Sequence, residues 1–161
     1  MSLYWLGGVI RVASAASRMP VVQYGVLPWR HRPDGLQVLL VTTQNTRRWI
    51  VPKGWPEEGR TPQECAAREG YEEAGVKGVV ADEALGVFSH KKQLKSGQMI
   101  TCRIRVYSME VSDIADDWPE KSARQAKWCP VDEALLRVEE SGLRRIIARF
   151  SRATAAIHKA A

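Results

Sequence analysis

The sequence predicts an α/β protein in which helices cover both faces of a mixed β-sheet. Two runs rich in β-branched and aromatic residues, at 21–29 and 36–42, are typical of strands. A third run, residues 99–111, alternates apolar and polar side chains, as expected of a strand with one buried face. Helical patterns lie between and after these strands. We therefore expect an α/β/α sandwich.

The other elements follow in chain order. The first two strands should form a hairpin, because residues 31–35 between them read His-Arg-Pro-Asp-Gly, which is a turn sequence. Residues 52–59 are expected to form a loop whose glycines allow the backbone to approach a ligand closely. Further strands are expected at 49–51, 79–88 and 127–129, and further helices at 131–138 and 142–152.

Residues 62–74 form the clearest predicted helix, because both of its ends carry signals. Thr61 is the expected N-cap, Pro62 takes the first helical position, and Glu64 completes a capping box. Gly75 should end the helix in the left-handed conformation that glycine adopts at little cost.

Three glutamates crowd one side of this helix. Glu69, Glu72 and Glu73 share a face because they stand at positions i, i+3 and i+4. Like charges at that spacing repel each other, and a cation between them removes the repulsion. Mg²⁺ prefers carboxylate oxygens and sites that also contain substrate phosphates. The pattern therefore indicates a divalent metal site, and the alternative is an ordinary acidic amphipathic helix.

This segment resembles the Nudix box, G-x5-E-x7-R-E-U-x-E-E-x-G-U, in which U is a bulky apolar residue. Seven positions match the box in register: Gly54, Arg68, Glu69, Glu72, Glu73, Gly75 and Val76. Two positions depart from it, because Arg60 replaces the first glutamate and Gly70 replaces an apolar residue. Gly70 lies opposite the glutamates, where a small residue lets the helix pack closely on a sheet, at a cost of about 1 kcal/mol in helix propensity.

The resemblance implies a Nudix fold and metal-dependent hydrolysis of a phosphoanhydride bond. It implies that Glu69 and Glu73, with the backbone carbonyl near Gly54, hold Mg²⁺ or Mn²⁺. Glu72 would then accept a proton from water, although the glutamate that acts as base differs among branches of the family. Arg68 would orient a box glutamate through a charge-assisted hydrogen bond. Arg60 leaves three alternatives open: fewer bound metal ions, a contact with substrate phosphate, or a side chain in solvent.

A narrower resemblance covers roughly residues 19–150. It is carried by four segments that are similar to diphosphoinositol polyphosphate phosphohydrolases, which also cleave diadenosine polyphosphates: 48–52, 71–78, 117–119 and 127–128. Lys53 departs from that group, which has glycine in this loop. The implied substrate is a dinucleoside polyphosphate or an inositol pyrophosphate. The alternatives are nucleoside triphosphates, nucleotide sugars or capped RNA, and a catalytically weak module that binds a polyanion.

The formal net charge of +6 suits an anionic small-molecule substrate with several phosphates. Seven basic residues are predicted to bind it: Arg47, Arg48, Lys53, Lys91, Lys92, Lys95 and Arg124. The lysines at residues 90–97 are expected at a hairpin tip, where flexible cations can reach a ligand. Their alternative is a solvated turn. RNA is a second partner class that the sequence does not favour, and the oligomeric state stays open.

The length of 161 residues fits one domain. We expect an N-terminal extension at 1–17, a Nudix hydrolase domain at 18–155 and a C-terminal tail at 156–161. The three cysteines are far apart in sequence and should be buried reduced thiols, which suits a cytoplasmic protein. The apolar run near the N-terminus is too short to span a bilayer, so no membrane association is expected.

Overall fold

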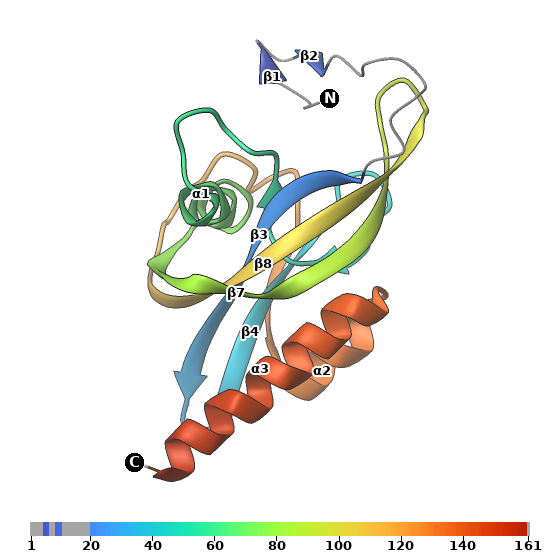
Figure 1. The fold of residues 1–161 in the computed structure, drawn as a ribbon. Coiled ribbons are helices and arrows are strands. Elements are labelled where there is room, and N and C mark those ends of the chain that lie inside the picture. The colour runs from blue at the N-terminus through green and yellow to red at the C-terminus, as the bar shows by residue number, and fades with distance from the viewer. Residues whose placement is uncertain (1–4, 7–8, 11–19, 161) are drawn as a thin grey trace.

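The computed structural model describes residues 5–6, 9–10 and 20–160, which are drawn in colour in Figure 1. Two short strands near the N-terminus, β1 (Trp5–Leu6) and β2 (Val9–Ile10), pair with each other in antiparallel orientation. The rest of the predicted N-terminal extension lies outside the described residues.

A mixed sheet of seven strands forms the centre of the described domain. Its main path runs β5–β4–β3–β8–β7, while β6 pairs with β3 and β9 pairs with β4. The strands are β3 (Val21–Arg32), β4 (Gly35–Thr42), β5 (Trp49–Ile50), β6 (Lys53–Gly54), β7 (Val76–Gln93), β8 (Met99–Ile114) and β9 (Ala126–Pro130). Strands β3 and β8 run parallel and the other pairings of this sheet are antiparallel, which confirms a mixed sheet.

Helix α1 (Pro62–Ala74) lies on one side of this sheet, and α2 (Val131–Arg137) and α3 (Ser141–Ala160) lie on the other (Figure 1). Both faces are packed, because apolar side chains from the sheet and the helices form one buried cluster. The predicted α/β/α sandwich is therefore confirmed. Within the described residues, no helix is long and apolar enough to cross a membrane.

Helix α1 begins and ends as its sequence predicts. The Thr61 side chain accepts a hydrogen bond from the Glu64 backbone N–H, and the Glu64 carboxylate accepts one from the Thr61 N–H at 2.8 Å. Gly75 ends the helix with a φ of 68°. A Cβ atom on Gly70 would lie 3.1 Å from Cγ1 of Val26 on β3, so this glycine lets the helix pack closely on the sheet.

Three elements differ most from the prediction. Strand β7 begins at Val76 and ends at Gln93, well beyond the predicted range of 79–88. Register shifts at three points interrupt the alternation of its side chains, so the sequence pattern did not reveal its full length. Helix α3 continues to Ala160, so residues 156–160, predicted as a tail, are helical. Lys53–Gly54, predicted as loop, pairs with β3 as a two-residue strand.

The three cysteines are buried and carry free thiols, as predicted: Cys65, Cys102 and Cys129. The apolar core also contains several fully buried side chains from β3, β4, β8 and α3, among them Leu27, Leu40, Ile104 and Leu143. This core fixes the sheet relative to α1, so the loops at the edge of α1 have a rigid support.

Candidate active site

The three predicted glutamates of α1 lie at different depths. Glu73 is 3% exposed, Glu69 is partly buried, and the Glu72 side chain is 28% exposed. Burial, together with the negative charges of Glu72 and Glu120, raises the pKa of Glu69 to about 7. Burial also raises the pKa of Glu73 well above its usual range, although nearby cations oppose this shift. The acidic face therefore holds carboxylates that are costly to ionise without a counter-ion.

Strand β6 brings Gly54 against this acidic face. A Cβ atom at this position would overlap the Glu69 carboxylate, so no larger residue fits while Glu69 keeps its position. Gly54 is held there by its antiparallel pairing with Tyr24 of β3. The structure thus brings together two of the three predicted metal ligands, Gly54 and Glu69, although they are distant in sequence from each other.

Arg124 lies inside the acidic cluster. Its guanidinium is 3.1 Å from Oε1 of Glu73, and it donates a hydrogen bond of 3.0 Å to the backbone carbonyl of Thr42. The Arg124 side chain is 13% exposed. Its role in binding substrate stays a prediction, but its position beside the deepest carboxylate was not foreseen.

Lys53 is the second cation of the cluster. It is 8% exposed, and burial lowers the pKa of its ammonium group, while the charge of Glu73 acts in the opposite direction. A buried lysine is rare unless it is paired. Lys53 and Arg124 therefore offset part of the negative charge of Glu69 and Glu73.

A fourth carboxylate, Glu120, was missed by the sequence prediction. Its backbone N–H donates to the carbonyl oxygen of Glu72 at 2.9 Å, and its carboxylate lies 3.4 Å from Nε of Arg124. The Trp118 ring packs directly against Gly75 and anchors the loop that carries Glu120. The similarity of residues 117–119 to the phosphohydrolase group pointed to this loop. No rule of sequence spacing, however, predicts that a carboxylate in a loop lies beside a helix earlier in the chain.

Arg68 holds two carboxylates at once. Its Nε donates to Oε1 of Glu72 at 2.6 Å, and its Nη1 donates to Oε2 of Glu57 at 2.6 Å. Arg60 is ion-paired with the same Oε2 of Glu57 at 2.8 Å. The Arg60 side chain is 47% exposed, so of the three alternatives its arrangement is nearest to a side chain in solvent, with an added ion pair within its own loop.

The chemistry of the acidic face fits a divalent cation. Oε2 of Glu73 is buried and has no hydrogen-bond partner, and burial raises the pKa of Glu69 by more than the nearby Lys53 and Arg124 lower it. Within the described residues, no three acidic, cysteine or histidine side chains converge closely enough to hold a metal ion as they stand. In this arrangement Arg68 is paired with Glu72 and Arg124 with Glu73.

The predicted hairpin tip of the basic segment is partly wrong. Lys91 and Lys92 belong to β7, which ends at Gln93, and only Lys95 lies in the turn. Lys91 and Lys95 are exposed, whereas Lys92 is partly buried, with Nζ 5.0 Å from the centre of the Trp55 ring. The charge of Lys92 also lowers the pKa of Lys53, so Lys92 lies close to the buried lysine of the cluster.

The two predicted arginines before β5 have protein partners. Arg47 donates to the Ala123 carbonyl at 3.1 Å, and Arg48 lies 3.4 Å from Oε1 of Glu140. The same Glu140 oxygen is 2.7 Å from Nδ1 of His90. These contacts connect the loop before β5 to β7 and to the start of α3.

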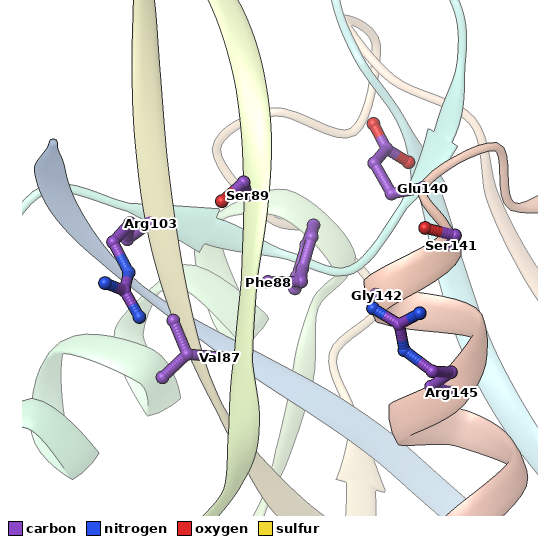
Figure 2. Close-up of a pocket in the computed structure, with 8 residues that line it drawn as sticks. All are labelled: Val87, Phe88, Ser89, Arg103, Glu140, Ser141, Gly142 and Arg145. Carbon is purple, nitrogen blue, oxygen red and sulfur yellow. The ribbon is translucent and has the colours of Figure 1, made fainter.

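A pocket of about 380 Å³ lies between β7 and the start of α3. Figure 2 shows Arg103 and Arg145 reaching it from β8 and from α3, with Glu140 above Ser141. It is lined by Val87, Phe88, Ser89, Arg103, Glu140, Ser141, Gly142 and Arg145. None of the predicted site residues is among them, so this pocket is separate from the acidic cluster.

The mixed sheet, the capped helix and its buried carboxylates define one class of protein. The chain belongs to the NUDIX domain family, whose model matches residues 21–150.

Curated relatives include plant and human proteins. The chain is 32% identical over 120 residues to "Nudix hydrolase 12, mitochondrial" of Arabidopsis thaliana, covering 73% of this chain and 59% of that protein. It is 37% identical over 102 residues to "Diphosphoinositol polyphosphate phosphohydrolase 3-beta" of Homo sapiens, covering 62% of this chain and 58% of that protein. The chain thus spans little more than half the length of these relatives.

Solved structures share the fold. The structure matches the "C. elegans Ap4A Hydrolase Binary Complex" with a TM-score of 0.64 and 19% identity, covering 84% of this chain and 98% of that one. It matches the NUDIX domain of Shewanella oneidensis NrtR complexed with ADP ribose with a TM-score of 0.63 and 20% identity, covering 86% and 92%. At these identities the likeness shows the fold alone.

Proposed function

We propose that this protein is a metal-dependent pyrophosphohydrolase that cleaves a phosphoanhydride bond in a dinucleoside polyphosphate or an inositol pyrophosphate. One observation carries the proposal: the buried Glu73 has an Oε2 atom with no hydrogen-bond partner, and the neighbouring Glu69 carboxylate packs against the backbone of Gly54. The human relative's name refers to diphosphoinositol polyphosphate and the nematode structure's title to Ap4A, which supports this substrate class.

Each residue of the acidic face has a proposed role. Glu69 and Glu73, with the carbonyl oxygen of Gly54, hold Mg²⁺ or Mn²⁺. The bound ion neutralises substrate charge and makes water a better nucleophile. Glu72 accepts the proton from that water, and Arg68 holds the Glu72 carboxylate in place through its Oε1 atom.

The positive residues of the cluster complete the proposal. A polyphosphate places several negative charges next to the acidic face, and Lys53 and Arg124 lie beside Glu73 to offset them. Lys92, which is close enough to influence Lys53, extends this positive charge toward β7. These three cations are the proposed contacts for the phosphates next to the scissile bond, and Arg47, Arg48, Lys91 and Lys95 are proposed for the more distant phosphates.

A substrate panel tests the proposal. Purified protein is assayed with Mg²⁺, with Mn²⁺ and with EDTA on diadenosine polyphosphates, inositol pyrophosphates, nucleoside triphosphates, nucleotide sugars and capped RNA. We expect metal-dependent release of product, fastest on the first two classes, and no release in EDTA or with Glu73→Gln. Faster turnover of a nucleotide sugar or of capped RNA would assign the protein to the alternative substrate class.

The second candidate function is a polyanion-binding module with little catalysis. It is favoured by the internal ion pairs, because Arg124 and Arg68 already engage Glu73 and Glu72. Its support among the structures is a NUDIX domain complexed with ADP ribose. Isothermal titration with non-hydrolysed analogues distinguishes the two, since tight binding with no turnover under either metal would favour the module. The cytoplasmic location stays a prediction, and several relatives carry mitochondrial names.

A further inference from the structure

Four charged side chains form a continuous chain along the side of the acidic face. Arg60 lies 2.8 Å from Oε2 of Glu57, Nη1 of Arg68 lies 2.6 Å from the same oxygen, and Nε of Arg68 lies 2.6 Å from Oε1 of Glu72. The first two residues belong to the loop before α1, and the last two belong to α1. This series of ion pairs therefore links the loop before α1 to Glu72, the proposed base.

Arg68 needs more than one partner to hold a fixed position. Its side chain is 41% exposed, and a single ion pair between residues i and i+4 leaves a long side chain free to adopt other rotamers. The guanidinium is a planar fork, so two carboxylates on two of its edges define its plane. Glu57 supplies the second carboxylate, and Arg60 contacts the same Oε2 atom of that carboxylate.

We propose that Glu57 is a positioning residue of the active site, which places a carboxylate against Arg68 in a loop whose position 60 carries an arginine. Glu57 fixes the guanidinium of Arg68, and Arg68 in turn fixes the carboxylate of Glu72 toward the attacking water. Arg60 fixes Glu57. The catalytic consequence rests on the proposed function, whereas the link from Glu57 to Arg68 does not.

The position of the Arg60 side chain allows a direct test, in which the carboxylate is moved from position 57 to position 60. Arg60 Nε and Arg68 Nη1 both contact Oε2 of Glu57. Because Nε is the fourth side-chain atom after Cα, that point along the side chain of residue 60 already lies near Arg68. A glutamate carries its carboxylate oxygens at that same position along the side chain. Arg60→Glu therefore places a carboxylate close to Arg68 when Glu57 is neutralised.

The activity experiment compares four variants with the wild type. Glu57→Gln should lower kcat by roughly 10–100-fold, the range found when groups that orient metal ligands are removed, with a smaller change in KM. Glu57→Gln with Arg60→Glu should recover most of that loss, whereas Arg60→Glu alone should not raise kcat. Glu58→Gln is the matched control, because Glu58 is the next residue of the loop, is exposed and carries the same charge.

A second measurement does not depend on activity. In ¹H–¹⁵N spectra, the Arg68 Nε–H should exchange slowly with water in the wild type and in Glu58→Gln, and faster in Glu57→Gln, because the guanidinium loses its fixed position. Thermal unfolding and Mn²⁺ binding by paramagnetic resonance should stay close to wild type in all variants. These readouts separate a positioning role from a folding defect or a lost metal.

The outcomes are distinguishable. If the wild type turns over nothing on the substrate panel, the proposed function fails, and the Nε–H exchange of Arg68 still decides whether Glu57 positions it. If Arg68 exchange is the same in Glu57→Gln and Glu58→Gln, the positioning role is overturned. It is also overturned if Glu57→Gln keeps wild-type kcat in an active enzyme, or if Arg60→Glu gives no recovery in the Glu57→Gln background.

Discussion

The acidic face of α1 and the basic end of β7 carry opposite charges in opposite environments. Glu73 is 3% exposed and its pKa is raised by burial, whereas Lys91 and Lys95 are exposed. A buried charge is costly unless something compensates it, while a solvated charge needs no partner. The acidic face therefore indicates a bound cation, whereas solvation alone accounts for the exposed lysines. Mutations should have large effects at the first region and small effects at the second.

The largest effect is expected at the deepest carboxylate. Glu73→Gln keeps the shape of the side chain and removes the charge that would bind the metal ion. Turnover should fall by more than about 100-fold, beyond the range for groups that only orient ligands. Activity at saturating Mn²⁺ and the thermal unfolding temperature are measured together, and the fold should survive. A wild-type rate at saturating metal would remove Glu73 from the set of ligands.

The success of the prediction for α1 and its failure for Glu120 have one physical reason. The face shared by Glu69, Glu72 and Glu73 follows from helical geometry, and the caps at Thr61 and Gly75 determine where that helix begins and ends. These are local rules, so the sequence alone reveals them.

The contacts that complete the cluster are not local. Arg124 meets Glu73 only because the loop after β8 folds over the end of α1, where Trp118 packs on Gly75. Likewise, the length of β7 was hidden by its register shifts near Gly78 and Ala84, which interrupt the two-residue period. Sequence patterns thus predicted the helix that carries the acidic face and missed both Glu120 and the contact of Arg124 with Glu73.

The proposed base should show the next largest effect. Glu72→Gln removes the proton acceptor while leaving Glu69 and Glu73 in place, so kcat should fall by roughly 10²–10⁴-fold. Mn²⁺ affinity should fall less than in Glu73→Gln. A variant that loses metal but has a normal rate per bound metal would instead make Glu72 a ligand, and Glu120 would be the next candidate for the base.

The buried carboxylates also predict how stability depends on pH. The folded protein holds a proton on Glu69 up to a pKa of about 7, whereas an unfolded glutamate loses it near its ordinary value of about 4.5. Between these values the folded state binds more protons than the unfolded state, so raising the pH through this window lowers the stability. The effect of Glu69 alone is at most about 3 kcal/mol, from 1.36 kcal/mol per pKa unit, and Glu73 acts in the same direction.

Thermal unfolding in EDTA at pH 5 and pH 8 measures this loss. The metal-free protein should be less stable at pH 8, and Glu69→Gln should reduce the difference because it removes one of the two ionising groups. Mn²⁺ should restore stability at pH 8, since a bound cation compensates the charges. Equal stability at both pH values without metal would show that Lys53 and Arg124 already compensate the acidic face.

The smallest effect is expected from the basic end of β7. Its three lysines differ in burial, so they compare a partly buried cation with two exposed ones. Lys92 is partly buried beside Trp55 and influences Lys53, whereas Lys91 and Lys95 are exposed. Lys92→Gln should therefore raise KM several-fold, and Lys91→Gln with Lys95→Gln should raise it less, although the pair removes twice the charge.

The losses should be greater for a long polyphosphate than for a dinucleotide with a two-phosphate bridge. They should also shrink between low and high salt, because a Debye length of about 10 Å at 0.1 M screens exposed charges more than buried ones. The measurement is kcat/KM for both substrates at two ionic strengths. Equal losses for the two substrates, or a greater loss from the exposed pair than from Lys92, would mean that burial does not distinguish the cations that contact phosphate from those that are merely solvated.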